Sequence, residues 1–142
     1  MVSIQFPKQP LGPGEFTAIV KDNNGAPSSV LEASRRFYIH CEWKISPLAA
    51  LLLGGKWNLA AYVESIGPGA EQQVGPTVTV DLTGATDYHA DIEVPAGTLP
   101  DLGPAPTPSS GAYKMVTLLT LENFGKATDV AAVVEGPVLR IG

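Results

Sequence analysis

The stretch that decides the fold is Phe37-Tyr38-Ile39-His40-Cys41-Glu42-Trp43-Lys44-Ile45. Along it every odd position is apolar and every even position is polar or amphipathic. This period of two is typical of a β-strand with one buried face, because successive side chains of a strand point to opposite sides. The apolar face, which includes Trp43, has to be covered by a second layer. We therefore expect a protein built from two packed layers.

Further segments of the chain alternate or are apolar, and clusters of Gly, Pro and Asn separate them. They are 15–21, 57–66, 74–82, 88–94, 111–121 and 127–141. Trp57 lies on the apolar face of its segment, so we expect two tryptophans on inward faces of adjacent strands. Glu135-Gly136-Pro137 interrupts the last segment and predicts a bulge or kink. With about seven or eight strands, the sequence predicts an all-β fold, an antiparallel two-sheet β-sandwich of the immunoglobulin-like kind.

Residues 47–53 favour a short helix instead of a strand. Pro47 stands at the start, Leu and Ala fill the segment, and Gly54-Gly55 follow it, which predicts about two turns of helix or a tight apolar crossover. Such an element often closes the open end of a sandwich. The alternative is an exposed apolar patch for a partner subunit. The candidate contact residues of that patch are Leu51, Leu52 and Leu53.

The length of 142 residues fits one domain that needs neither disulfides nor a metal to bury a core. We assign the domain to residues 15–142 and expect an extended arm over residues 1–14, which contain three prolines. The arm either docks on a neighbouring subunit or is a frayed terminus. Residues 95–111 contain five prolines and predict a long loop, either a recognition loop or a spacer. Leu102 is the candidate contact residue of that loop.

The composition of the chain argues against some classes of binding partner. The formal net charge is −5 and the nine Lys and Arg are dispersed apart from Arg35-Arg36, which argues against a nucleic-acid or anionic-membrane surface. The single cysteine cannot form an internal disulfide. The first residues lack the pattern of a signal peptide, and the longest apolar run is less than half of a bilayer span. We expect a cytoplasmic protein without membrane insertion, with export by a signal-independent route left open.

The sequence offers little chemistry. His40 and Cys41 point to opposite faces of one strand and cannot bind one ion together. His89 shares a face with Asp87 and Asp91, which indicates either a divalent-ion or pH-sensitive patch or a solvated acidic edge. The chain has no Gly-x-Ser-x-Gly elbow and no phosphate-binding loop. We therefore expect no catalytic residue, no cofactor and no metal, and hence no enzyme.

Two stretches begin with a Gly-x-aromatic-x-apolar pattern. They are Gly55-Lys56-Trp57-Asn58-Leu59-Ala60-Ala61-Tyr62-Val63 and Gly111-Ala112-Tyr113-Lys114-Met115-Val116-Thr117. In this the chain resembles the immunoglobulin-like and fibronectin-like sandwich modules of bacteria, although the unpaired Cys41 does not support an antibody-type disulfide core. With the segment 62–69, it is also similar to small sandwich proteins of phage-tail-like contractile injection systems. That likeness implies a structural accessory role without an active site.

Exposed aromatic and apolar residues indicate a function more clearly than the histidines, cysteine and carboxylates do. Tyr38 and Tyr62 are predicted to point outward from strands that are candidates for neighbours, where they either form a binding platform or pair to stabilise the sheet. Residues 116–121 are apolar on both faces, as in a centre strand or one covered by a neighbouring subunit. The leading hypothesis is a non-enzymatic structural or protein-binding module that self-associates or joins a larger assembly. The alternative is a carbohydrate-binding module that uses Tyr38, Tyr62 and the 95–111 loop.

Overall fold

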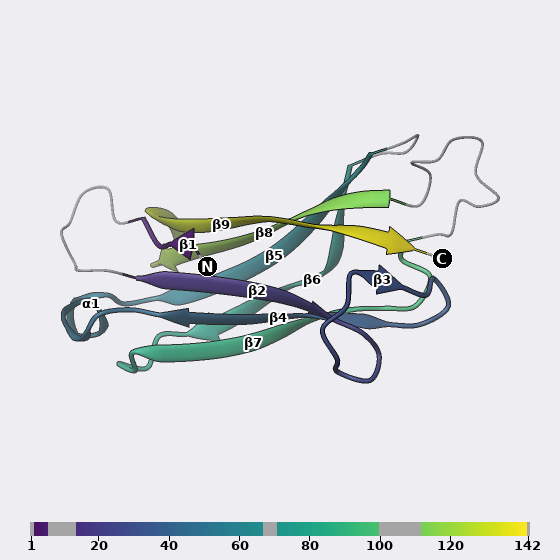
Figure 1. Ribbon diagram of the computed structural model, residues 1–142. Helices are drawn as coiled ribbons and strands as arrows, with labels where there is room; N and C mark the ends of the chain where they lie inside the picture. The colour runs from purple at the N-terminus through teal and green to yellow at the C-terminus, as the bar shows by residue number, and fades with distance from the viewer. Residues whose placement is uncertain (1, 6–13, 67–70, 100–111, 142) are drawn as a thin grey trace.

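The computed structural model describes residues 2–5, 14–66, 71–99 and 112–141 (Figure 1). Within these ranges the chain forms nine strands and one short helix. The elements are β1 (Val2–Ser3), β2 (Glu15–Lys21), β3 (Val30–Leu31), β4 (Phe37–Lys44), α1 (Pro47–Leu52), β5 (Lys56–Ser65), β6 (Gln72–Asp81), β7 (Asp87–Val94), β8 (Ala112–Asn123) and β9 (Lys126–Ile141).

The strands form two sheets that lie on top of each other (Figure 1). One sheet has four strands in the order β1-β2-β4-β7, and the other has five in the order β3-β9-β8-β5-β6. All neighbouring strands are antiparallel except β3 and β9. The predicted all-β two-sheet sandwich is therefore confirmed. The strand beyond the predicted count is β1, which is two residues long and too short to show a period in the sequence. The equally short β3 lies where Val30 and Leu31 favour a short strand that leads into β4.

An aromatic cluster lies at the centre of the core. Trp43 and Trp57 are both buried, as predicted, with ring centroids 6.1 Å apart and planes at 68°. Tyr88 stacks on Trp43 at 5.6 Å. The expectation that the two tryptophans lie on adjacent strands was wrong, because β4 and β5 belong to different sheets. The chain changes sheet through α1, so the two indoles meet across the core.

Both sides of the sandwich are partly closed. On one side Val2 pairs with Phe16 of β2, and Gln5 then bridges Ala131 of β9 in the other sheet. The described part of the predicted arm thus follows an edge-strand path on its own domain. The remainder of the arm, residues 6–13, lies outside the described residues. On the other side a Cβ added to Gly75 of β6 would lie 2.8 Å from the Glu93 carbonyl of β7, so the two edge strands approach closely.

Two local predictions are confirmed. Lys114 pairs with Val138 whereas Val116 pairs with Glu135, so β9 contains one extra residue at this point, which is the predicted bulge. Helix α1 begins where predicted, and its first turn is capped by the Ser46 hydroxyl, which accepts a hydrogen bond from the Ala49 N–H at 3.1 Å.

Candidate interaction surfaces

The outer face of the four-stranded sheet is charged. Its side chains alternate with the core residues of β4 and β7 and form ion pairs across the strands. Arg36 lies 3.2 Å from Glu93, and Lys44 lies 4.0 Å from Asp87. Pairs as exposed as these contribute little to stability, and the face is well solvated. An outer surface of this kind is typical of a sheet that faces water.

His40 lies at the centre of this face. Its Nδ1 contacts Oδ1 of Asp91, which is its partner in the register of β4 and β7, and its Nε2 lies 3.1 Å from Oε1 of Glu42. Asp91 shares the outward face of β7 with Asp87 and His89, as predicted, and its direct neighbour across the strands is His40. The rings of His40 and His89 are 6.4 Å apart. No group of three or more His, Cys, Asp or Glu side chains in the described ranges is arranged to hold a metal ion.

The stability of the folded chain is expected to fall as the pH rises past the titration of His40. The hydrogen bond to Asp91, helped by that to Glu42, raises the pKa of His40, although partial burial opposes the shift. Since the folded pKa lies above the unfolded value of about 6.5, the contribution is complete below that pH and is lost as the pH rises through the raised pKa. Urea unfolding between about pH 6 and pH 9 should show this loss. In Asp91→Asn the loss of stability with rising pH should be smaller, and the midpoint of the NMR titration of His40 should move to lower pH. An unchanged midpoint would contradict the contact between His40 and Asp91.

Cys41 is an inert core residue. Its thiol is buried, and that burial raises its pKa to about 12, with a smaller contribution from the charge of Asp91. A buried thiol that stays protonated at neutral pH is a poor nucleophile. This agrees with its place on the inward face of the opening sequence stretch.

The two candidate tyrosines do not form one platform. Tyr38 lies on β4 and Tyr62 on β5, and these strands belong to opposite sheets, so the expectation of neighbouring strands was wrong. Because both side chains point outward, they lie on opposite faces of the molecule. The Arg36 guanidinium also lies 5.7 Å from the ring centroid of Tyr38 and covers part of its face. A sugar ring cannot stack on both rings at once.

The three candidate leucines of the α1 segment differ in how far they are buried. Leu51 and Leu52 are 79% and 60% exposed, whereas Leu53 is partly buried and packs against the core. Ala49 and Ala50 are the buried residues of the helix, so α1 closes the end of the sandwich with its small side chains and presents its large ones outward. Leu102 lies outside the described residues, as does most of the 95–111 loop. The start of that loop is held on the domain, since Leu99 is buried.

The outer face of the five-stranded sheet is apolar at its centre, in contrast to the other sheet. Cross-strand pairing places Ala60 beside Leu118, Leu118 beside Val133, and Tyr62 beside Val116. We call these five residues the apolar band. Their neighbours in sequence on β5 and β8 point into the core, so both faces of the central strands are apolar. The apolar residues on both faces of 116–121 indicated the part of this surface that lies on β8. The parts on β5 and β9 could not be predicted from the sequence, because they depend on which strands pair.

Charged residues flank the apolar band along the strands. At one end Lys56 pairs with Glu122, and at the other end Glu64 pairs with Lys114. We call these four residues the charged corners. Polar residues of β6 form a third border, where the Thr79 hydroxyl donates to Asn58 Oδ1 at 3.0 Å. An apolar centre with a polar rim is the usual anatomy of a protein interface.

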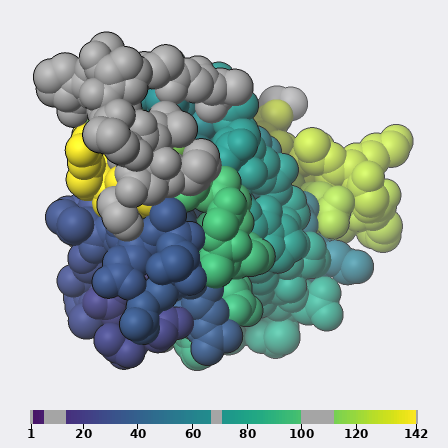
Figure 2. Space-filling view, turned by 90° about the vertical axis from the view of Figure 1, so that its right-hand side faces the viewer, coloured from purple at the N-terminus to yellow at the C-terminus, as the bar shows by residue number. Residues whose placement is uncertain are grey.

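A phenylalanine at the tip of the β8–β9 hairpin is the most exposed large apolar side chain described. Phe124 is 96% exposed and has φ +54°, followed by Gly125 at φ +72°. Figure 2 shows this hairpin, in yellow-green, projecting from the side of the molecule. The sequence predicts a turn here, but we did not recognise Phe124 as a candidate contact residue. The clue in the sequence is an aromatic residue at a turn position that usually favours Asn.

Replacing Phe124 by asparagine is expected to raise the free energy of unfolding by about 1 kcal/mol, because Asn tolerates the left-handed conformation that Phe resists. Urea unfolding measures the change. The control is Phe124→Ala, which removes the ring but keeps a side chain that resists positive φ, and should give a smaller gain. Equal gains from Asn and Ala would assign the cost to the ring and contradict the backbone argument.

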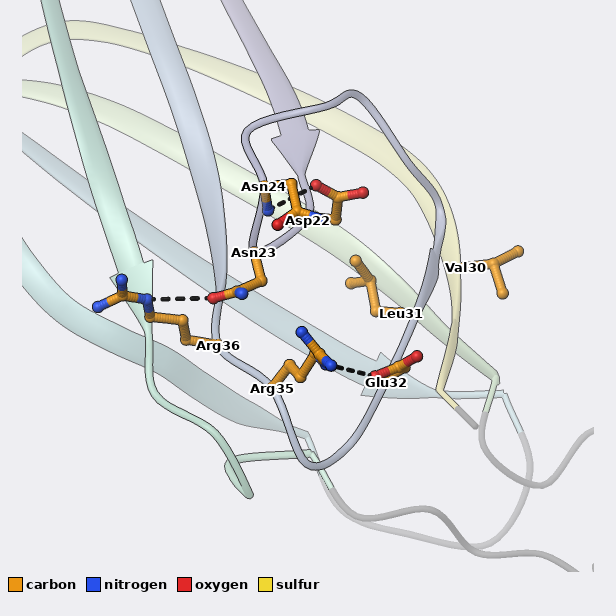
Figure 3. A pocket seen from close by; sticks show the side chains of 8 residues that line it. All are labelled: Asp22, Asn23, Asn24, Val30, Leu31, Glu32, Arg35 and Arg36. Carbon is orange, nitrogen blue, oxygen red and sulfur yellow. Dashed lines mark hydrogen bonds and ion pairs between the residues drawn. The ribbon is translucent and has the colours of Figure 1, made fainter.

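A polar hollow of about 280 Å³ lies between the loops that flank β3, and Figure 3 shows the side chains around it. Arg35 lies 2.7 Å from Glu32, and Arg36 Nε donates to Asn23 Oδ1 at 3.3 Å. The Asp22 carboxylate accepts hydrogen bonds from backbone N–H groups of its own turn. These groups satisfy one another within the loops, and the described residues that line the hollow include no activated nucleophile.

No helix in the described ranges is long and apolar enough to span a membrane.

Comparisons with known proteins give a remote structural likeness. No family model matches the sequence, and no curated protein matches it. The crystal structure of β-glucosidase from Listeria innocua in complex with glucose aligns at a TM-score of 0.48 and 12% identity, over 91% of this chain and 16% of that one. Its complex with gluconolactone aligns at 0.49 and 13% over the same shares. The chain thus spans about a sixth of the length of that enzyme, and at this similarity nothing of the enzyme's activity transfers to it.

Proposed function

We propose that this chain is a non-enzymatic β-sandwich module that works by protein contact, with the apolar band as its contact surface. The observation that carries the proposal is the difference between the two outer faces. Two layers suffice to bury the core, so the outer face of each sheet should be polar in a module that stands alone. The four-stranded sheet follows this rule along β4 and β7, as at His40 and Asp91, with Ile19 of β2 as an exception. The five-stranded sheet departs from the rule at its centre, at Leu118 and Val133.

The energetics of burial support a contact at the band. Removing apolar surface from water yields about 25 cal/mol per Å², and an apolar centre surrounded by polar residues is where this gain is concentrated in interfaces. Tyr62 adds an aromatic ring of the kind enriched in such centres. The likeness to bacterial immunoglobulin-like modules and to sandwich proteins of contractile injection systems is consistent with a structural accessory role.

The carbohydrate-binding alternative has less support. It relied on Tyr38 and Tyr62 acting together with the 95–111 loop, and the two rings lie on opposite faces. A single tyrosine beside aliphatic side chains, as Tyr62 is beside Val116, suits burial against protein better than stacking on a polar sugar.

Site-specific photo-cross-linking tests the proposed function. The photoreactive residue p-benzoylphenylalanine is placed at Leu118 in the band, or at Glu42 on the charged outer face as the control, in the cells that naturally produce the chain. We expect a discrete adduct from position 118 and none from position 42, because only the band is covered. No adduct from position 118, or the same adducts from both positions, would overturn the proposal.

A further inference from the structure

Resting on the proposed function, we infer that the partner on the apolar band is a second copy of this chain, packed face to face about a two-fold axis. The argument comes from the charged corners. On β5 the positive residue Lys56 stands at one end of the band and the negative Glu64 at the other. On β8 the order is reversed, since Glu122 lies beside Lys56 and Lys114 beside Glu64.

This arrangement is complementary to itself. Two identical sheet faces meet only if the two-fold axis lies in the plane between them. If the axis runs along the strands between β5 and β8, Lys56 faces Glu122 of the second copy, and Glu64 faces Lys114. If the axis runs across the strands, Lys56 faces Glu64 of the second copy, and Lys114 faces Glu122. Opposite charges therefore face each other in either orientation. A second copy of the chain supplies all the charges that this pairing requires.

The geometry of the band suits this symmetry. Ala60 and Leu118 lie midway between the two charged rows, four residues from each row along their strands. A two-fold axis through this point places the centre of the band of one copy against the centre of the band of the other. It also places each row of charged corners against a row of charged corners. Sheets that pack face to face lie about 10 Å apart, a distance filled by interdigitating aliphatic side chains such as Leu118 and Val133. Lys114 also lies 3.5 Å from Glu135 of β9, so this lysine already has a second acidic neighbour within its own chain.

The first test is the mass of the purified chain in solution. Size-exclusion chromatography with light scattering, from about 1 µM to about 100 µM, should show a dimer that dissociates on dilution. Val133→Lys places a charge in the band and should weaken the dimer at least about tenfold. Ile19→Lys is the matched control, because Ile19 is 41% exposed on the outer face of β2 and Val133 is 43% exposed. The control should leave the dimer unchanged, and circular dichroism should show that both variants fold.

Charge reversal tests the two-fold axis and does not disturb the core. Lys114→Glu places like charges opposite each other in both orientations and should weaken the dimer. Adding Glu64→Lys restores the pairing only if the axis runs along the strands. Adding Glu122→Lys restores it only if the axis runs across them. Rescue by one double variant and not the other identifies the axis, and rescue by neither overturns the face-to-face arrangement.

The two proposals fail in different ways. A chain that is monomeric throughout the concentration range, or a dimer that Ile19→Lys weakens and Val133→Lys does not, overturns the second-copy inference. A discrete cross-link from position 118 to a different protein overturns it too, yet leaves the protein-contact function standing. The absence of any cross-link from position 118 removes the proposed function itself.

Discussion

Replacing Trp57 by alanine is expected to lower the free energy of unfolding by about 3–5 kcal/mol, as for other buried aromatic residues. Trp57 is fully buried in β5 and meets Trp43 of the opposite sheet edge to face. Tyr88 packs against it from the same opposite sheet, at 6.2 Å between ring centroids. The substitution therefore empties the space where the two sheets contact each other through aromatic rings. Since domains are stable by only about 5–15 kcal/mol, the variant should be close to unfolding.

Urea unfolding followed by far-ultraviolet circular dichroism measures this loss. The control is Trp57→Phe, which keeps an aromatic ring in the core and sacrifices no hydrogen bond, because Trp57 Nε1 has no partner among the described residues. Its cost should be about 1–2 kcal/mol, well below that of alanine. Equal and small losses in the two variants would mean that the aromatic cluster does not hold the sheets together.

Much of the fold could be predicted because strand periodicity is a local property. The alternation at 37–45 shows which side chains of β4 point inward, and the structure buries Phe37, Ile39, Cys41 and Trp43 accordingly. Helix α1 was recognisable from its flanking Pro and Gly residues, which constrain the backbone locally. The bulge in β9 was recognisable in the same way, from Gly136 and Pro137.

The choice of strand neighbours could not be predicted, because it depends on contacts between distant parts of the chain. An outward side chain looks the same in the sequence whichever sheet it belongs to. Tyr38 and Tyr62 were therefore placed together although α1 carries the chain from one sheet to the other between them. His40 and Asp91 are 51 positions apart and meet only through the register of β4 and β7. The apolar band was visible in its β8 part alone for the same reason.

Replacing Gly55 by alanine is expected to lower the free energy of unfolding by about 3 kcal/mol, from strain at positive φ together with overpacking. Gly55 has φ +111°, a conformation that L residues rarely adopt. A Cβ at this position would lie 2.0 Å from the Glu122 carbonyl oxygen and 3.0 Å from the Asn123 Cα, both backbone atoms of β8. Neither can move away unless the end of β8 separates from the start of β5, where Lys56 pairs with Glu122.

The adjacent glycine is the matched control. Gly54 has open space around the position of an added Cβ and does not have positive φ, so Gly54→Ala should change the free energy of unfolding by no more than about 0.5 kcal/mol. Urea unfolding of the two variants compares them directly. Since Glu122 is one of the charged corners, displacement of its backbone by Gly55→Ala should also weaken the dimer, whereas Gly54→Ala should leave it intact. Equal stability of the two alanine variants would contradict the close approach of β5 to the end of β8, and with it the position assigned to Glu122.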